Sequence, residues 1–306
     1  MASFKNIIIC LDLTEMDEVL IKYANFLTST FESKKLTFIH VMETIDIPDE
    51  LAEAFPDMDK PLNEIIREEI EEQVHGLFEH ADKVEIDIIL DSGIPTEQII
   101  QHARKRRVDL ALLGKKTGYA GEGGVAKRIV GLMPATVLMV SETSPHHINN
   151  ILVRMDFSKM SAMALKTAQT IAGHTQAKVE CHHVYKLPLD FMPQQSPSAL
   201  QKLKKQMGGF VSKQFAGFLK KNKMEADAVC TYSIDHHGDE AQILYGYAIK
   251  TGADLVLAGS KIKSPLANVM LDSTSEKLAS PNKSIPVMVV KDQKQSIGFL
   301  KALFDF

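Results

Sequence analysis

The chain has 306 residues, of which 45% are hydrophobic and 24% are charged, and its formal net charge is −4. These values are typical of a globular protein and exclude a disordered chain. No apolar run reaches the roughly 18 residues that a membrane-spanning helix needs. The start of the chain leads directly into a strand-like segment, so we expect no signal peptide. The three cysteines are scattered without a CxxC motif, which favours a reducing compartment and predicts a cytoplasmic protein.

Charge is divided unevenly along the sequence. Residues 1–145 hold 15 basic and 26 acidic side chains, whereas residues 146–306 hold 20 basic and 13 acidic ones. The segment 60–83 is rich in Glu, and its counterpart 199–223 is rich in Lys and carries an apolar stripe. The asymmetry predicts that the two halves contact each other or that the protein binds a charged partner. Two separately solvated faces explain it equally well. A basic amphipathic helix can meet a membrane, but a core-facing stripe is commoner, and we expect neither a membrane nor a nucleic-acid partner.

The sequence contains one long internal repeat. Residues 6–14, which read NIIICLDLT, return as residues 150–158, which read NILVRMDFS. So long a period indicates two copies of a whole domain rather than a solenoid. We therefore predict a first domain over residues 1–145 and a second domain, with an apolar C-terminal tail, over residues 146–306.

Short apolar runs alternate with segments of helical periodicity in each copy. In the first copy we predict strands at 6–12, 36–42, 84–91, 109–113 and 136–140, and helices at 16–31, 60–80, 95–105 and 124–133. In the second copy we predict strands at 150–156, 177–185, 227–234, 254–259 and 286–290, and helices at 160–173, 197–221, 239–251 and 271–280. Apolar strands that alternate with helices imply a parallel sheet covered on both faces. In such sheets ligands bind beyond the strand C-termini, where the strand order reverses.

Four motifs recur in the same order in both copies. They are a strand-end aspartate (Asp12, Asp156), a His-Val pair (His40-Val41, His183-Val184), a strand-end glycine (Gly114, Gly259) and a last strand after a proline (Pro134, Pro286). Together they resemble the universal stress protein family in its tandem two-domain form, over nearly the whole chain. The resemblance implies an α/β fold of two flavodoxin-like, Rossmann-like αβα sandwich domains. Each would hold a parallel five-stranded sheet of order 3-2-1-4-5, and the two, related by a pseudo-two-fold axis, would pair through their last strands.

ATP-binding members of this family carry a G-x2-G-x9-G-[ST] loop after the fourth strand, where backbone N–H groups and a helix N-terminus hold the phosphates. In the first copy Gly118, Gly121 and Gly131 match this spacing, but Leu132 replaces the hydroxyl. We prefer a register in which Gly123 and Gly124 open the last helix, because the helix then keeps its length. A glycine-rich turn without function is the alternative. By resemblance, the nucleotide-binding candidates of the first copy are Asp12, Val41, Gly114, Lys115, Gly118, Gly121, Gly123 and Gly124.

The loop of the second copy departs further from the family pattern. Ser273 matches the hydroxyl, but Ile262 and Asp272 stand where the second and third glycines belong. A carboxylate at Asp272 would repel phosphate and instead suits a helix N-cap. By resemblance, the candidates here are Asp156, Val184, Gly259, Ser260 and Ser273. We therefore expect ATP, or another adenine nucleotide such as ADP or AMP, more in the first copy than in the second.

The strand-end aspartates have two interpretations. By resemblance, Asp12 and Asp156 would hold the adenine or ribose, but caps of the turns that follow the strands explain them equally well. Thr14 and Ser158 come two residues later in each copy. We predict that these two are helix N-caps rather than ligand contacts.

A weaker candidate is a zinc site in the second copy. His183 ends the second strand, and Asp235, His236 and His237 follow the third, whose C-terminal end lies beside it in the expected order. Alternation along a strand sends His182 and His183 to opposite faces, so at most one of them joins a cluster. Packing or solvation of these histidines is the more common situation.

The sequence contains no GxSxG elbow, no GxxxxGK[ST] loop and no HExxH motif. We therefore expect a nucleotide-responsive regulatory protein of the stress response rather than an enzyme, with a homodimer as one possible assembly. The alternative is a nucleotide-free scaffold that binds an unidentified protein through its charged faces. Slow ATP hydrolysis is a third hypothesis.

Overall fold

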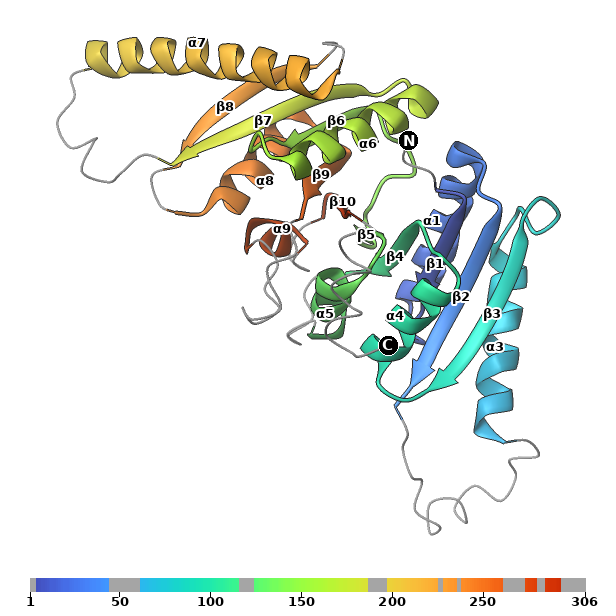
Figure 1. Cartoon of the computed structure of the whole chain (residues 1–306). Coiled ribbons are helices and arrows are strands. Elements are labelled where there is room, and N and C mark those ends of the chain that lie inside the picture. Colours follow the sequence, from blue (N-terminus) through green and yellow to red (C-terminus); the bar gives the residue numbers. More distant parts are fainter. Residues whose placement is uncertain are drawn as a thin grey trace.

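The computed structural model describes residues 4–43, 61–115, 124–186, 197–224, 228–235, 238–260, 273–279 and 284–292 (Figure 1). Within these ranges, ten strands form one sheet that runs through both halves of the chain. The strands are β1 Asn6–Cys10, β2 Lys35–Met42, β3 Glu85–Ser92, β4 Leu110–Gly114, β5 Thr136–Val140, β6 Asn150–Arg154, β7 Lys178–Lys186, β8 Val229–Asp235, β9 Leu255–Gly259 and β10 Val287–Val290.

The strand order is β3-β2-β1-β4-β5-β10-β9-β6-β7-β8. This is the order 3-2-1-4-5 followed by its mirror image, and the strand pairs within each half are parallel. The pair β5–β10 is antiparallel. The predicted strand order and the pairing through the last strands are therefore confirmed, while the domain boundary after residue 145 stays a prediction.

Helices cover both faces of the sheet (Figure 1). They are α1 Met16–Phe31, α3 Leu62–Leu77, α4 Pro95–Lys105, α5 Gly124–Leu132, α6 Lys159–Thr175, α7 Pro197–Asn222, α8 Glu240–Thr251 and α9 Ser273–Leu278. The apolar faces of α1, α3, α6 and α7 line one core, and those of α4, α5, α8 and α9 line a second core on the opposite face. The predicted elements are all present, with ends shifted by a few residues. The helix α3 ends at Leu77, earlier than predicted, because Phe78 adopts an extended conformation and packs its ring on Phe38.

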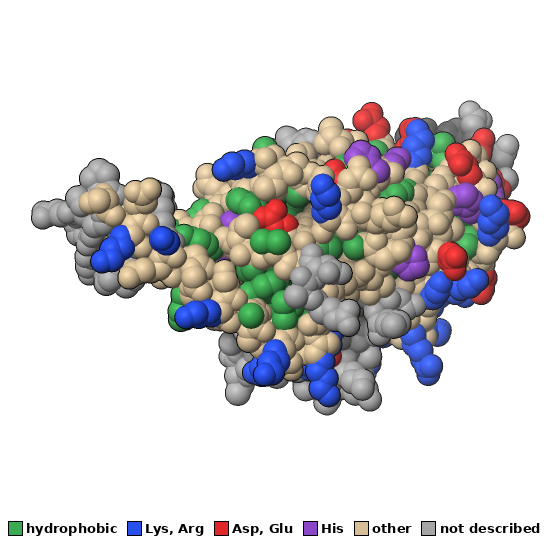
Figure 2. Space-filling model, turned by 90° about the horizontal axis from the view of Figure 1, so that it is seen from above, with side chains coloured by type: hydrophobic (Ala, Val, Ile, Leu, Met, Phe, Trp, Pro, Cys, Tyr) green, Lys and Arg blue, Asp and Glu red, His purple; other side chains and the backbone are tan. Residues whose placement is uncertain are grey.

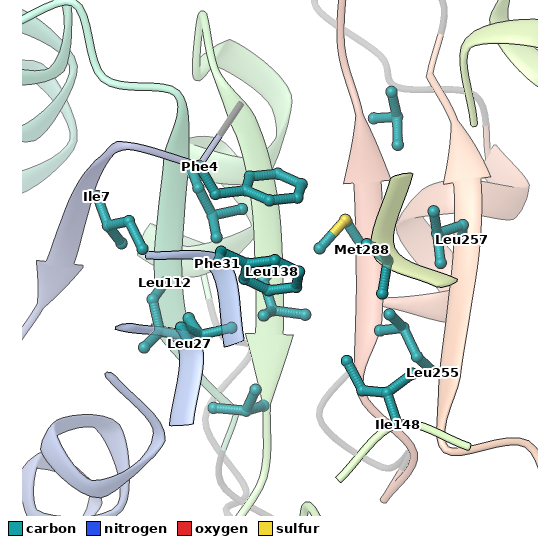
Figure 3. Packing of buried hydrophobic residues seen from close by; sticks show 14 of the residues in the cluster. Phe4, Ile7, Leu27, Phe31, Leu112, Leu138, Ile148, Leu255, Leu257 and Met288 are labelled. Atoms are coloured by element: carbon teal, nitrogen blue, oxygen red, sulfur yellow. The ribbon is translucent and has the colours of Figure 1, made fainter. Parts of the chain in front are cut away.

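The two halves meet at the antiparallel pair β5–β10. Leu138 lies opposite Met288 near the centre of this pair, and both side chains are buried. Figure 3 shows that the apolar cluster continues from these residues to Ile7 and Leu112 on one side and to Leu257 on the other. Across the join α1 packs against α6, and α5 against α9. The two halves therefore share their cores, which makes the join a part of the protein interior.

Two buried lysines also cross the join. The Lys115 ammonium donates a hydrogen bond to the Ile285 carbonyl oxygen at 2.8 Å, and the Lys291 ammonium donates one to the Gly131 carbonyl oxygen at 3.0 Å. Gly131 lies in the last turn of α5, where helix carbonyls favour a positive charge. Burial nevertheless lowers the pKa of Lys291 to about 7. The cost of burying this charge should therefore depend on pH.

The substitution Lys291→Met should change how stability depends on pH. Below about pH 7 the ammonium is charged in the folded and the unfolded chain, so folding carries its full desolvation cost. Between about pH 7 and 10 the unfolded chain binds one more proton, and the free energy of unfolding rises by up to about 1.4 kcal/mol per pH unit. The variant lacks this rise, so its advantage over the parent should shrink as the pH increases. Urea unfolding from pH 6 to 10 measures the difference, with the exposed Lys250→Met as control. If the free energy of unfolding changed with pH in the same way in parent and variant, the lowered pKa of Lys291 would be contradicted.

Candidate functional site

In each half the strand order reverses beside the first strand, between β1 and β4 and between β6 and β9, and ligands of such sheets bind at this point. Asp12 follows β1, Gly114 ends β4, and Gly124 begins α5. Asp12 and Gly114 thus lie at the C-terminal ends of two neighbouring strands. The predicted site residues Gly118, Gly121, Gly123, His236 and His237 lie outside the described residues.

The turn between β1 and α1 is organised by Asp17. Its buried carboxylate accepts hydrogen bonds from the backbone N–H groups of Asp12 and Leu13, each at 2.9 Å. Leu13 has a φ of 57°, a left-handed conformation that this carboxylate helps to hold. The Asp12 side chain is exposed and accepts a hydrogen bond from the Thr14 hydroxyl at 2.5 Å. An exposed carboxylate at this turn is compatible with either interpretation of Asp12.

The predicted capping role of Thr14 is confirmed by its hydroxyl, which accepts a hydrogen bond from the Met16 N–H at the start of α1 at 3.3 Å. Glu15, the residue directly before the helix, makes no side-chain capping bond. Asp17 was missed, although the spacing Thr14-x-x-Asp17 is that of a capping box, in which the acidic side chain reaches back to the preceding backbone.

In the second half, Ser158 is the N-cap of α6, as predicted. Its hydroxyl accepts a hydrogen bond from the Ser161 N–H at 3.3 Å, and the Ser158 N–H donates to the Asp156 carboxylate at 2.9 Å. Burial opposes ionisation of Asp156, but the hydrogen bonds from Ser158 and Ser161 and the charge of Arg154 outweigh it and lower the pKa of Asp156. Asp156 is therefore a charged cap of its own turn.

The repeated His-Val pairs have a structural role in both halves. The His40 ring is 3.0 Å from the Leu11 carbonyl oxygen, and the His183 ring is 2.6 Å from the Met155 carbonyl oxygen, each through Nδ1. These contacts tie the second strand of each half to the chain that leaves the first. The adjacent valines, Val41 and Val184, are buried in the core beneath α4 and α8.

The glycines that end β4 and β9 are required by close packing. A Cβ atom at Gly259 would lie 2.4 Å from the Met160 carbonyl oxygen, which belongs to the backbone of α6. At Gly114 it would lie 2.4 Å from Cγ of Met16, a flexible side chain. In contrast, a Cβ atom at Gly124 would meet nothing within 4 Å. Among the described residues, none lies against the Cβ position of Gly124, which is exposed at the start of α5.

Lys115 and Ser260, the residues after these glycines, are buried. Their backbone N–H groups donate to the Val140 and Val290 carbonyl oxygens, which extends the pairing of the fourth and fifth strands. The Lys115 ammonium contacts the second half at Ile285. The nucleotide-binding role expected of Lys115 and Ser260 stays a prediction, and the structure shows both side chains buried.

A buried ion pair joins the end of β6 to the start of α8 in the second half, and sequence reasoning missed it. Arg154, at the end of β6, donates to the Glu240 carboxylate from Nε at 2.6 Å and from a terminal nitrogen at 3.2 Å. The Thr274 hydroxyl, near the start of α9, donates to the same carboxylate at 3.1 Å. The side chains of Arg154 and Glu240 are 8% and 10% exposed. The Glu240 carboxylate therefore contacts the first turn of α9 through Thr274.

The first half carries no ion pair at the corresponding positions. Cys10 ends β1 where Arg154 ends β6, and Pro95 begins α4 where Glu240 begins α8. Val125, the second residue of α5, is 43% exposed, whereas Thr274, the second residue of α9, is buried. The three corresponding positions of the first half, Cys10, Pro95 and Val125, therefore hold no charged side chain.

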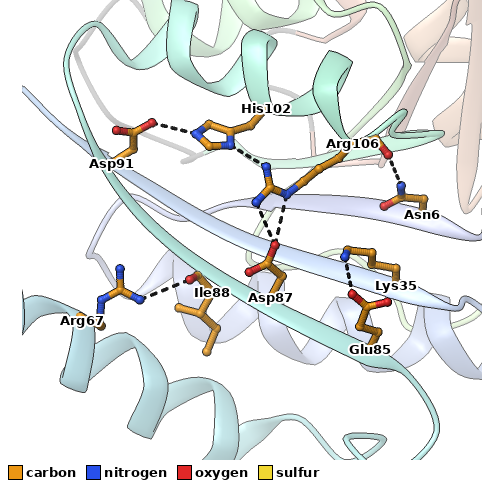
Figure 4. Close-up of polar contacts among 9 residues, drawn as sticks. All are labelled: Asn6, Lys35, Arg67, Glu85, Asp87, Ile88, Asp91, His102 and Arg106. Atoms are coloured by element: carbon orange, nitrogen blue, oxygen red, sulfur yellow. Dashed lines mark hydrogen bonds and ion pairs between the residues drawn. The ribbon is translucent and has the colours of Figure 1, made fainter.

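A chain of polar contacts lies between β3 and α4, away from the crevice (Figure 4). Arg106 donates to the Asp87 carboxylate at 2.9 and 3.2 Å and to Nδ1 of His102 at 2.8 Å. Because Arg106 can only donate, Nε2 of His102 carries the proton and donates to Asp91 at 2.7 Å. This hydrogen bond is the main cause of a lowered pKa at Asp91.

The second half places a different polar cluster between β7, β8 and α8. His182 is buried, stacks on Tyr247, and lies 2.7 Å from the Thr231 hydroxyl and 2.9 Å from the Ser233 hydroxyl. Thr231 donates to Glu180, so it accepts from Nδ1 of His182, and Nε2 accepts from Ser233. Burial lowers the pKa of His182 to about 4. This imidazole is therefore neutral and too weak a base to activate Ser233 near neutral pH.

The zinc prediction rests on His183, Asp235, His236 and His237. His182 and His183 do lie on opposite faces, since one contacts β8 and α8 and the other contacts Met155 and Phe157. The Asp235 carboxylate accepts a hydrogen bond from the Gly238 N–H at 2.7 Å. Among the described residues, no three His, Cys, Asp or Glu side chains are grouped to hold a metal ion. The zinc site stays a prediction, half of whose residues are outside the described ranges.

These observations define a class of protein, a tandem pair of Rossmann-like α/β domains joined through their last strands. The model of the universal stress protein family matches residues 3–141 and again residues 147–291. The chain therefore belongs to the universal stress protein family. No curated protein matches it.

Two solved structures show the same fold over almost their whole length. A universal stress protein from Archaeoglobus fulgidus is 17% identical, with 95% of this chain and 98% of that chain covered and a TM-score of 0.60. A protein of unknown function from Pseudomonas aeruginosa is 13% identical, with 100% and 99% covered and a TM-score of 0.66. No helix in the described ranges is both long and apolar enough to cross a membrane.

Removing one partner of the buried ion pair should be strongly destabilising. Glu240→Ala leaves the Arg154 guanidinium buried without its carboxylate, and we expect a loss of about 3–5 kcal/mol in the free energy of unfolding. The double variant Arg154→Met/Glu240→Leu should recover most of this loss, because it removes both charges. Glu18→Ala, which breaks the exposed ion pair with Lys22, should cost less than about 1 kcal/mol. Urea unfolding measures all three, and an unaffected Glu240→Ala would contradict a structural role for the pair.

The two strand-end glycines should respond differently to the same substitution. Gly259→Ala places a methyl group against the α6 backbone, which cannot move away without shifting the helix, and should cost about 3 kcal/mol. Gly114→Ala meets the flexible Met16 side chain and should cost about 1 kcal/mol. Chemical unfolding measures the loss in the free energy of unfolding for each variant. Equal losses would show that contact with the α6 backbone is not what requires a glycine at position 259.

Proposed function

We propose that the protein is a cytoplasmic, nucleotide-responsive regulatory protein of the stress response, with one adenine-nucleotide site in its first half. The observation that carries this proposal is the contrast between the crevices. In the second half the Arg154–Glu240 pair fills the place beside α9, while in the first half the start of α5 is open at Gly124. A nucleotide bound there would alter the energy of conformations or partner complexes that contact the same loop.

The chemistry of the first crevice suits a phosphate. The helix α5 has nine residues, and its first N–H groups lack intrahelical partners, so they are donors for an anion. Glycines 118, 121, 123 and 124 allow the backbone to approach closely. Asp12, exposed at the end of β1, lies on the side where an adenine or ribose would bind by family resemblance.

A second candidate function is that of a scaffold which binds no nucleotide and acts through protein contacts. The use of Lys115 at the join favours it, because the loop then loses the cation nearest to β4. We propose no catalytic role, and His182, the histidine nearest a serine hydroxyl in the second half, is too weak a base to support one.

Nucleotide content separates the two candidates. Protein purified rapidly, without added nucleotide, is denatured, and the released ligand is quantified by mass spectrometry; binding of ATP, ADP and AMP to the emptied protein is then measured by calorimetry. We expect about one nucleotide per chain. Absence of both retained ligand and binding would favour the scaffold, and two per chain would show that Glu240 does not close the second crevice.

Gly124→Asp should weaken nucleotide binding at least about tenfold, because a carboxylate at the start of α5 repels phosphate. The fold should be preserved, since the new side chain meets nothing within 4 Å and an acidic residue suits a helix N-terminus. Gly246→Asp, on the exposed side of α8, is the matched control and should bind as the parent does. Unchanged binding by Gly124→Asp would place the nucleotide elsewhere.

A further inference from the structure

The helix α7 has 26 residues, and its described buried side chains all lie from Val211 onward. Val211, Phe215, Phe218 and Leu219 are buried in the core, and they are the last apolar residues of the helix. Before them the described side chains are mostly exposed, including Lys202, Lys205 and Phe210. Figure 1 shows the first turns of α7 extending beyond the tips of β7 and β8. Among the described side chains of this part of the helix, the Phe210 ring lies 6.5 Å from the Tyr185 ring, centroid to centroid, and most of the others face solvent.

An uncovered helix end of this sequence is poorly stable by itself. Gly208 and Gly209 interrupt it, and each glycine costs about 1 kcal/mol relative to Ala in a helix interior. Phe210 is 60% exposed, and Val229, at the start of the edge strand β8, is 68% exposed. Stabilisation of such a segment normally comes from packing on another surface.

The charge of α7 defines the chemistry of that surface. Residues 197–222 contain six lysines and no acidic residue. Lys202, Lys205 and Lys213 are exposed. Figure 2 shows lysine or arginine side chains, and no acidic ones, among the described residues of the narrow end of the molecule. The partner surface should therefore be acidic and partly apolar.

The first half of the chain carries such a surface on α3, the repeat counterpart of α7. Glu64, Glu68, Glu69 and Glu72 are exposed on this helix. Two apolar side chains are exposed beside them, with Leu62 at 43% and Ile65 at 37%. The single arginine of the helix, Arg67, pairs with Glu71 at 3.8 Å.

The helices α3 and α7 cannot meet within one chain. They cover the outer strands β3 and β8, which are the two edges of the ten-stranded sheet, about 40 Å apart at the usual strand spacing. A second copy of the chain can bring its α3 to this α7. We propose that copies associate head to tail, with the basic, uncovered part of α7 in one copy docked on the acidic face of α3 in the next.

A second copy fits the exposed groups better than a lipid surface does. Insertion of a helix into a bilayer needs a wide apolar face, and the apolar residues in the second half of α7 are already buried against the sheet. The contact joins two different surfaces, so it does not close by a two-fold axis, and further copies can add at either end. Association should therefore grow with concentration and weaken with salt.

Sedimentation velocity of the full chain, over about 5 to 200 µM and at about 50 and 500 mM NaCl, tests the proposal. We expect the average mass to increase with concentration at low salt and to approach that of the monomer at high salt. Lys202→Glu/Lys205→Glu makes the part of α7 before Val211 net acidic, and Glu64→Lys/Glu68→Lys removes the net negative charge of α3. Each variant alone should associate at least about tenfold more weakly than the parent. An equimolar mixture should recover association, because the second variant's α7 and the first variant's α3 are unchanged and again join opposite charges.

The matched control is Lys166→Glu/Lys250→Glu, which makes the same change in net charge at exposed positions of α6 and α8. It should associate as the parent does. A parent that is monomeric under all conditions, a mixture that does not recover, or a control that fails equally would overturn the proposal. So would binding of α7 to vesicles of anionic phospholipid without self-association, since a membrane would then be the partner.

Discussion

The antiparallel pairing of β5 with β10 is the interaction on which the rest of the structure depends. It joins two parallel half-sheets into one, and the apolar clusters on both faces run across it. Because the last strand of each half is paired, the open edges of the sheet are β3 and β8. The same pairing places the two points of strand-order reversal on opposite sides of the join. It also brings Lys115 and Lys291 against the other half, where each donates a hydrogen bond to a carbonyl oxygen.

The periodicity predicted the elements because it is a local signal, and the repeat supported them because the same motifs recur in the same order in both copies. Each predicted strand was found, and the family resemblance supplied the order of the strands. Ser158 was predicted correctly as a cap because its partner, Ser161, lies three residues away. For the same reason Asp17 could have been found from its spacing to Thr14.

Contacts between distant residues could not be predicted in this way. Arg154 and Glu240 are 86 positions apart, and Lys115 and Ile285 are 170 apart. Nothing in the spacing of these residues indicates that they meet, since the meeting depends on how β6, α8 and the join are placed in space. Lys115 was therefore predicted as a nucleotide-binding residue because it follows Gly114 in the sequence. In the structure its ammonium group contacts the other half at Ile285.

In a single chain, equivalent positions of the two halves can carry different residues, which is impossible in an assembly of identical subunits. In a symmetric dimer, a side chain at the axis recurs in its mate, so a buried ammonium would appear twice. Here Lys115 has Ser260 as its counterpart after the fourth strand, and Lys291 has Ser141 after the fifth. Gene fusion thus permits one lysine and one serine at each pair of equivalent positions. An identical pair of subunits with both lysines would instead bury four like charges at their contact, which desolvation opposes.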